Sequence, residues 1–168
     1  MDSQQLKAIQ SPLKDSYRED AARALVTLNA DAQLNGEAVA CSVQTGRALV
    51  EAGLHPASGG DGSLACSGDM LLQALVACAG VTLRSVAVNR GIEVRGGTVR
   101  ASGDLDFRGT MAVDRDTPVG FRAIRLAFEL DSDADDEQLD ELIAITERYC
   151  VVLQTLANSP ELVVSRAA

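Results

Sequence analysis

Two cysteines that lie far apart in the sequence are the residues best suited to chemistry. Cys78 stands between two alanines in the apolar stretch from Asp69 to Val88, and Cys150 lies in the segment ERYCVVLQTL near the other end of the chain. A cysteine between alanines is also a common small core residue, and that reading stays open here. If the two cysteines meet in the fold, they can act as a redox pair, because a sulfenic acid on one condenses with the other thiol to give a disulfide.

The other candidate ligands do not form a pattern typical of a metal or nucleotide site. His55 is the only histidine, and the cysteines at positions 41, 66, 78 and 150 lack the paired spacing of a zinc site. The Gly- and Ser-rich segment from His55 to Ser67, predicted to be a loop, has no GxGxxG pattern and no Lys before Ser or Thr. We therefore expect no metal and no cofactor. Cys41 is interpreted as a core-facing strand residue and Cys66 as a spectator.

The stretch that holds Cys78 predicts one long apolar helix. Asp69 is a typical helix start residue, and the run of Leu, Ala and Met after it favours a helix over a strand by its length and composition. Between positions 70 and 83 only Gln73 and Thr82 are plainly polar. A helix that is apolar on nearly every face is typically enclosed by other elements, so this stretch is expected to form the core helix.

Cys150 follows a second predicted helix. The acidic cluster at residues 131–136 leads into DEQLDELIAITERYC, where Leu139, Leu142 and Ile143 form a helical stripe. Acidic residues in the first turn of this helix complement its dipole, and the cluster lacks the spacing of a calcium loop. Residues 151–156 are expected to continue the helix or to form a second short one.

Strands account for most of the remaining chain. Residues 24–34 and 37–48 are predicted to pair as a hairpin across an Asn35-Gly36 turn, and residues 48–53, 92–107, 121–130 and 161–165 are predicted as further strands. The order of strands and helices predicts an α+β domain with antiparallel sheets. The length of 168 residues suits a single domain over residues 21–168, preceded by an N-terminal helical arm over residues 1–20.

Composition narrows the partners that the chain is expected to have. The formal net charge is −9 and aromatic residues make up only 3% of the chain, which argues against phosphate-backbone contacts and base-stacking platforms, and so against nucleic acid. No export signal is visible at the N-terminus, and the longest apolar run is interrupted by polar residues, so no membrane partner is expected. We expect a cytoplasmic protein whose four cysteines are thiols in the reducing environment.

These segments together resemble the OsmC/Ohr family of osmotically inducible protein C and organic hydroperoxide resistance proteins, in its OsmC-like subgroup. The resemblance rests on TGR at Thr45 to Arg47, on LLQALVAC ending at Cys78, and on a helix that leads into Cys150, in this order and separation. It implies an OsmC-like fold, with antiparallel sheets packed on two central helices in an intertwined homodimer. It also implies thiol-dependent reduction of organic hydroperoxides.

The resemblance assigns roles to matching residues. Cys78 resembles the peroxidatic cysteine, Cys150 the resolving cysteine, and Arg47 the arginine that holds the thiolate and orients the peroxide. Catalytic members often carry a Glu ten residues before the first cysteine, where this chain has Gly68 followed by Asp69. Asp69 either replaces that carboxylate or only favours the helix N-terminus.

A second departure from the family pattern follows the second cysteine. Many members carry Pro there, where this chain has Val151.

The implied chemistry needs Cys78 as a thiolate. Asp69 precedes it by nine residues, or roughly 13 Å along a helix, which is too far for the helix dipole to contribute much, so Arg47 is expected to lower the pKa of Cys78. A Cys78–Cys150 disulfide requires Cα atoms within about 7 Å, and an external dithiol would reduce it. The alternatives are a non-catalytic binding module for an apolar small ligand and a purely structural dimer.

Overall fold

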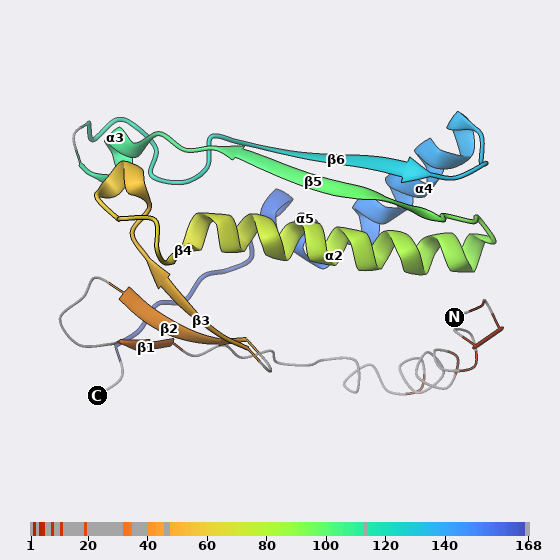
Figure 1. Cartoon of the computed structure of the whole chain (residues 1–168), viewed down its shortest axis with the longest axis horizontal. Coiled ribbons are helices and arrows are strands. Elements are labelled where there is room, and N and C mark those ends of the chain that lie inside the picture. The colour runs from red at the N-terminus through yellow and green to blue at the C-terminus, as the bar shows by residue number, and fades with distance from the viewer. Residues whose placement is uncertain are drawn as a thin grey trace. The chain divides into compact units, whose positions relative to one another are not determined.

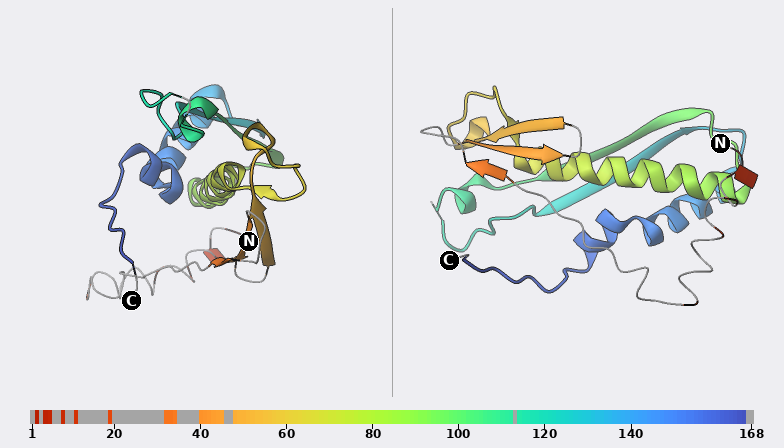
Figure 2. Two further views of the ribbon diagram at one scale, coloured as in Figure 1. Left: turned by 90° about the vertical axis from the view of Figure 1, so that its left-hand side faces the viewer. Right: turned by 90° about the horizontal axis from the view of Figure 1, so that it is seen from below.

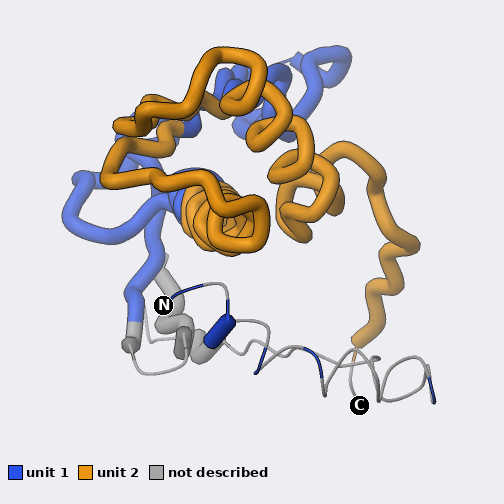
Figure 3. Tube along the Cα trace, turned by 90° about the vertical axis from the view of Figure 1, so that its right-hand side faces the viewer, with its two compact units in different colours: residues 1–73, 101–125 blue, residues 74–100, 126–168 orange. Residues whose placement is uncertain are grey.

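The computed structural model describes residues 2, 4, 5, 8, 11, 19, 32–34, 40–45, 48–112 and 114–166, with the backbone alone for 32–34, 40–45, 48 and 49. The predicted N-terminal arm falls almost entirely outside these residues, as do Arg47, the predicted turn at Asn35 and Gly36, and most of the predicted strand at 24–34. Cys41 lies in a strand whose side chains are not among those described. The chain forms two compact units, residues 1–73 with 101–125 and residues 74–100 with 126–168 (Figure 3).

Helices and strands alternate in the α+β manner predicted (Figure 1). In chain order they are β1 (Ala32–Leu34), β2 (Ala40–Thr45), β3 (Ala48–Gly53), the 3-10 turn η2 (Pro56–Ser58), β4 (Ala65–Cys66), α2 (Ser67–Arg90), β5 (Gly96–Asp104), α3 (Phe107–Thr110), β6 (Ala123–Asp131), α4 (Asp136–Tyr149) and α5 (Val151–Ala157).

The strands form two sheets. In the first, β1, β2 and β3 pair antiparallel in sequence order, and β3 also pairs with the short β4 in parallel. This parallel pair is a departure from the all-antiparallel prediction, and β4 and η2 both lie in a segment predicted to be only loop. The second sheet is the ribbon β5–β6, in which Arg95 N–H donates to Asp131 O and Arg122 N–H to Asp104 O, an antiparallel register.

Helix α2 forms where the sequence predicts it and extends slightly further at both ends. It ends at Arg90 because Gly91 adopts a left-handed φ of 71°, which allows Ile92 N–H to reach back to Ala87 O. Only Leu75, Ala79, Leu83 and Ala87 are buried, one residue per turn. In the single chain, the prediction that other elements enclose this helix therefore holds for one face only.

The core of the second unit lies between α2, α4 and the ribbon. Leu83, Ala87, Val94 and Leu142 are buried together, and Phe128, Leu130 and Leu139 pack against them. Figures 1 and 2 show α4 and the adjoining part of the ribbon running along α2. The helical stripe predicted from Leu139 and Leu142 is thus the face of α4 that meets α2.

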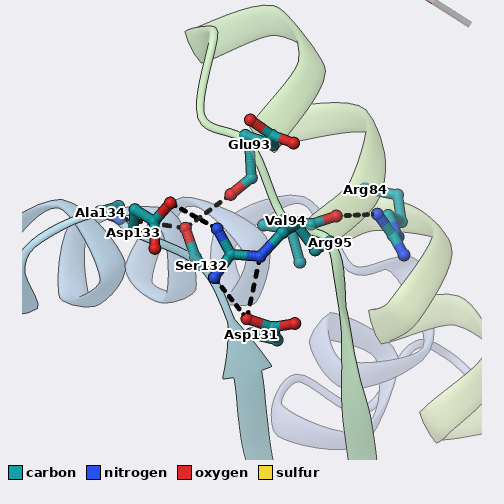
Figure 4. A network of polar contacts seen from close by, with 8 residues as sticks. All are labelled: Arg84, Glu93, Val94, Arg95, Asp131, Ser132, Asp133 and Ala134. Atoms are coloured by element: carbon teal, nitrogen blue, oxygen red, sulfur yellow. Dashed lines mark hydrogen bonds and ion pairs between the residues drawn. The ribbon is translucent and has the colours of Figure 1, made fainter.

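Polar contacts fix the turn from β6 into α4. Arg95 at the start of the ribbon pairs with Asp131 at 2.6 Å and with Asp133, while Ser132 Oγ donates to Glu93 O (Figure 4). Asp135 then caps α4 in a capping box with Gln138. The end of β6 is therefore tied to the chain just before β5, and α4 is capped by residues at its own start.

Two apolar segments, residues 161–165 and helix α2, bear on further predictions from the sequence. The predicted closing strand at 161–165 is wrong, because these residues form an irregular exposed segment in the single chain. Among the described residues α2 alone is long and apolar enough to cross a membrane, with a mean hydropathy of 1.8. Core helices of other proteins meet the same criterion, so the expectation of no membrane partner stays a prediction.

Candidate active site

Cys78 and Cys150 both belong to the second unit. Cys78 lies in the middle of α2 and is partly buried, whereas Cys150 is completely buried at the junction between α4 and α5. Neither forms a disulfide here. Each of these two thiols contributes to the pKa shift of the other, so the two predicted site residues lie near one another within this unit.

The position of Cys150 is set by the end of one helix and the start of the next. Its N–H donates to Thr146 O at 2.9 Å and its carbonyl accepts from Gln154 N–H at 2.9 Å, so it ends α4 and precedes α5. Its ψ of 106° is extended, which makes the break between the two helices. Thr146 is buried as well and donates its hydroxyl to Leu142 O at 2.8 Å. Both sides of the junction are therefore fixed by hydrogen bonds.

The environment of Cys78 favours its thiolate. Burial by itself raises the pKa of this thiol, but four donors act in the opposite direction and leave the pKa below its ordinary value. In order of effect, they are the Val152 N–H, the Cys150 thiol, the Thr82 hydroxyl and the Val151 N–H. All four donors are uncharged.

The pKa of the Cys150 thiol is shifted in the opposite direction. Burial raises the pKa of the Cys150 thiol, and its neighbour Cys78 adds to the effect, because a thiolate at Cys78 accepts the Cys150 proton and repels a second negative charge. The N–H groups of Leu153 and Val152 oppose the increase without cancelling it. When the pair loses a proton, Cys78 is therefore the thiol that loses it first.

Of the other two predicted site residues, the structure describes only Asp69. Arg47 lies outside the described residues, so its predicted role stays a prediction. Asp69 is exposed in the first turn of α2 and belongs to the first unit, where it lines a pocket of about 340 Å³ together with His55, Cys66, Leu72 and Phe121 among others. His55 stacks on Phe107 with ring centroids 5.0 Å apart.

Sequence reasoning missed the donors that act on Cys78. Thr82 has a signal, because a hydroxyl four residues after a cysteine lies on the same face of a helix. The N–H groups of Val151 and Val152 have no such signal in the sequence, since every residue except proline carries an N–H group. They become donors only because the chain breaks at Cys150 and starts a new helix, whose first N–H groups have no partner within the helix.

Comparison with known proteins gives one family and a set of similar folds. A family model described as OsmC-like protein matches residues 60–165. This range includes both thiols and Asp69, but not Arg47. No protein with a curated description matches the chain by sequence.

Solved structures of related fold come from several bacteria. An OsmC like protein from Mycoplasma pneumoniae is 19% identical with a TM-score of 0.67, over 80% of this chain and 89% of that one. An organic hydroperoxide resistance protein OsmC from Legionella pneumophila is 18% identical with a TM-score of 0.62, over 80% and 91%. The organic hydroperoxide resistance protein OhrB of Bacillus subtilis is 19% identical with a TM-score of 0.54, over 80% and 93%. At these identities the likeness shows the fold alone, and it confirms the OsmC-like α+β fold expected from the sequence, whereas the homodimer stays a prediction.

Proposed function

Because this chain belongs to the OsmC-like protein family, we propose that it is a cysteine-based peroxidase that reduces organic hydroperoxides to alcohols. In this proposal Cys78 attacks the peroxide and Cys150 resolves the product. Two of the three solved structures described above are named organic hydroperoxide resistance proteins, which is consistent with the proposal.

The observation that carries the proposal is the opposite shift of the two thiols. A thiol with a lowered pKa is the better nucleophile at neutral pH, and a neighbouring thiol with a raised pKa keeps its proton until it is needed. Cys78 is also the more exposed of the two, so a substrate reaches it first. Packing alone does not require the pKa values of two core cysteines to shift in opposite directions.

The first chemical step consumes the peroxide. The Cys78 thiolate attacks one oxygen of the O–O bond, an S–O bond forms, and the other oxygen leaves with the electron pair as an alkoxide. The alkoxide takes up a proton and becomes the alcohol. Sulfur is oxidised to the sulfenic acid by two electrons, and the peroxide is reduced by the same two.

The second step uses Cys150. After losing its proton, its sulfur attacks the Cys78 sulfenic acid, an S–S bond forms, and the hydroxyl group leaves and is protonated to water. The effect of each thiol on the pKa of the other supports a short distance for this reaction. An external dithiol then reduces the disulfide by thiol exchange and becomes oxidised itself, so the cycle needs no metal or cofactor.

The surroundings of Cys78 favour an apolar peroxide. From Ala74 to Leu83 only Cys78 and Thr82 carry a polar side chain. An alkyl or aryl group that is buried against such a surface gains about 25 cal/mol per Å². We therefore propose organic or lipid hydroperoxides as substrates, ahead of hydrogen peroxide.

The proposal also includes a homodimer in the cytoplasm, with Arg47 as a further donor to the Cys78 thiolate and to the peroxide. The dimer is supported by the exposed apolar residues of α2, among them Leu71 and Val81. Exposed apolar surface commonly marks an interface where it gathers into a patch. Arg47 is proposed because its guanidinium can donate to two oxygens at once.

An oxidation experiment tests the proposal. The reduced protein is mixed with an equimolar amount of cumene hydroperoxide, the remaining peroxide is measured, and disulfides are mapped by mass spectrometry. We expect wild type to consume the peroxide and to form the Cys78–Cys150 disulfide. Cys150→Ser should stop at the sulfenic acid, and Cys78→Ser should consume no peroxide. Equal consumption by wild type and Cys78→Ser would reject the mechanism.

A second function, a binding module for an apolar small ligand without turnover, draws support from the first unit. Gly68 stands where catalytic members often have a carboxylate, and the pocket around His55 and Phe121 has room for a small ligand. This function would be favoured over the peroxidase if a ligand copurifies with the protein and Cys78 does not react with peroxide.

A further inference from the structure

A cavity of about 240 Å³ lies between α2 and the start of the ribbon, and all of its wall residues belong to the second unit. The large apolar side chains of its wall are Leu83, Val94, Val99 and Leu130. Two of them, Leu83 and Val94, are part of the buried core. Among the described residues that line the cavity, only Arg84 and Thr98 carry polar side chains. The cavity is therefore an apolar space with a single charged group in its wall.

Arg84 is held at this wall by one nitrogen of its guanidinium. Its Nη1 donates to the carbonyl oxygen of Val94, another wall residue (Figure 4). Within the part of the chain that the structure describes, Nε and Nη2 donate to no protein acceptor. A guanidinium binds a carboxylate through two neighbouring nitrogens, and Nε with Nη2 is such a pair. The contact with Val94 thus fixes the guanidinium and leaves a pair of donors available.

Other arginines have their carboxylate partner within the chain. Each of the following forms an ion pair with an Asp or Glu: Arg90, Arg95, Arg100, Arg108, Arg122 and Arg125. The partner of Arg84 is instead a neutral backbone carbonyl, and no carboxylate of the described residues pairs with it. Its side chain is exposed, so an anion from solution can reach it. The wall therefore offers one positive charge that the described chain does not neutralise.

Two glycines keep the cavity open although the backbone does not require them. Gly80 lies within α2, where glycine is less favourable than alanine, and a Cβ there would meet Val99 at 3.8 Å, an ordinary contact. A Cβ at Gly96 would meet no atom within 4 Å. Gly97 differs, because its φ of 142° and its close approach to Glu129 O demand glycine. Side chains at positions 80 and 96 would fit the fold but would occupy the cavity.

We propose that this cavity binds a small organic monocarboxylate, with its carboxylate on Arg84 and a short apolar chain against Leu83, Val99 and Leu130. One cation in an otherwise neutral wall matches one negative charge. The formal net charge of −9 disfavours ligands that carry several negative charges. The hydroxyl of Thr98 can donate to the second carboxylate oxygen. Neither thiol lines the cavity, so this site does not depend on the proposed peroxidase function.

A titration with sodium octanoate tests the site. Octanoate is added at neutral pH to the full-length reduced protein labelled with ¹⁵N, and amide spectra follow Gly80, Gly96 and Gly97 in the wall. We expect the signals of these amides to shift and to saturate. 1-Octanol, which has the same chain and no charge, is titrated in parallel. If octanoate causes no saturable shift of the three amides in wild type, the proposal is wrong.

The charge is tested with Arg84→Gln, which keeps a side chain able to donate to Val94 O. Its midpoint for octanoate should rise about tenfold, because a charge-assisted contact is lost, whereas its midpoint for 1-octanol should stay unchanged. Arg90→Gln is the matched control, since it removes a charge from the same helix at a residue outside the wall. It should bind octanoate as wild type does. Equal midpoints in Arg84→Gln and Arg90→Gln would overturn the role of Arg84.

The space is tested with Gly80→Leu, whose side chain should fill the cavity and weaken the binding of both octanoate and 1-octanol about tenfold or more. Circular dichroism verifies the fold, and Gly96→Val replaces this variant if leucine at position 80 unfolds the protein. Unchanged octanoate binding in the folded variant would place the ligand elsewhere and overturn the proposal.

The competing occupant of the cavity is a second copy of the chain. In that case the midpoint for octanoate would rise as the protein is concentrated, because the copies would compete with the ligand. We expect a midpoint that, after correction for bound ligand, is the same at all protein concentrations. A midpoint that rises with protein concentration would assign the cavity to an interface between copies and overturn the ligand site.

Discussion

At the scale of single residues, the groups around two chemically identical side chains shift their pKa values in opposite directions. Both thiols are desolvated, which alone would raise both pKa values. Only Cys78 has enough donors around its sulfur to reverse the effect. One of those donors is the proton of Cys150, so the lowered pKa of one thiol and the raised pKa of the other have partly the same cause.

The first prediction follows from the direction of the two shifts. Reduced wild-type protein alkylated over a range of pH should show a Cys78 midpoint below the ordinary thiol value of about 8.5 and a Cys150 midpoint above it. The measurement is peptide-level mass spectrometry after a short exposure to iodoacetamide. A Cys78 midpoint equal to or above that of Cys150 would contradict the assignment of nucleophile and resolving thiol.

The same shifts predict the effect of pH on stability. The folded state lowers the pKa of Cys78, so this thiol contributes stability above its unfolded pKa, and the contribution is lost as pH falls through the folded pKa. The folded state raises the pKa of Cys150, so its contribution is complete below the unfolded pKa and is lost as pH rises through the folded pKa. Denaturant titrations should show that Cys150→Ser weakens the loss of stability at alkaline pH. An identical pH profile in wild type and variant would contradict this.

Part of the site could be predicted from the residue types in the sequence. The apolar stretch around Cys78 and the helix before Cys150 were enough to select the two thiols. The direction of each pKa shift was not predictable, because two of the donors are backbone N–H groups and because desolvation depends on the packing of α4 and α5 against α2. Arg47 was predicted to supply the stabilising charge and stays untested.

At the scale of elements, the start of α5 is a source of free donors. No side chain caps this helix, and Cys150 precedes it in an extended conformation with φ −73° and ψ 106°. The N–H groups of Val151 and Val152 are left without a partner in the helix and act on Cys78 instead. The break between α4 and α5 therefore affects the reactivity of a residue on α2.

A proline substitution tests this contribution. Val151→Pro removes one donor N–H, yet proline suits the first position of a helix, and the extended conformation of Cys150 is one that residues before proline adopt. We expect a folded protein whose Cys78 alkylation midpoint lies above that of wild type. Val151→Ala keeps the N–H and is the control. If the alanine variant shows the same increase, the side chain of Val151 and not its N–H is responsible.

The capping box of α4 can be tested separately. Asp135→Ala removes the carboxylate that accepts from Gln138 N–H at 2.9 Å, which should cost about 1 kcal/mol and lower the melting temperature by about 2–4 °C. Asp136→Ala, one residue into the helix, should cost less because it is not the cap. Differential scanning calorimetry measures both. A larger loss for Asp136→Ala would show that charge, and not the cap, stabilises this helix end.

Among the elements, those defined by local signals were the predictable ones. Both α2 and α4 have typical start residues; α4 has an apolar stripe, and α2 has a long apolar run that ends at a glycine. Strand β3 forms at the six residues predicted for it. The predicted strand at 161–165 is wrong because an apolar run becomes a strand only where it finds a neighbour, and the sequence does not give one. The pairing of β4 beside β3 is likewise decided by tertiary contacts.

At the scale of the whole molecule, the exposed apolar residues of α2 are typical of a helix that packs against a partner. Val81 is 73% exposed on a helix whose composition is typical of a core. The sequence predicted an enclosed helix, and a homodimer would reconcile that prediction with a chain that buries only one face of it.

Val81→Glu tests the dimer. A carboxylate on this face would be costly to bury, so we expect the dissociation constant of the dimer to increase about tenfold or more. Met111→Glu, at an exposed apolar residue in a turn, is the control and should not change it. Sedimentation velocity over a range of protein concentrations gives both values. A wild-type protein that stays monomeric at all concentrations would contradict the proposed dimer.

The irregular segment after α5 has a practical consequence. Leu162, Val163 and Val164 are 77%, 83% and 96% exposed, so a protease can bind this stretch in the single chain without any unfolding. If a second copy covers the segment, cleavage there should slow as the protein is concentrated. The rate of trimming in a dilution series would then report self-association with no label attached to the protein.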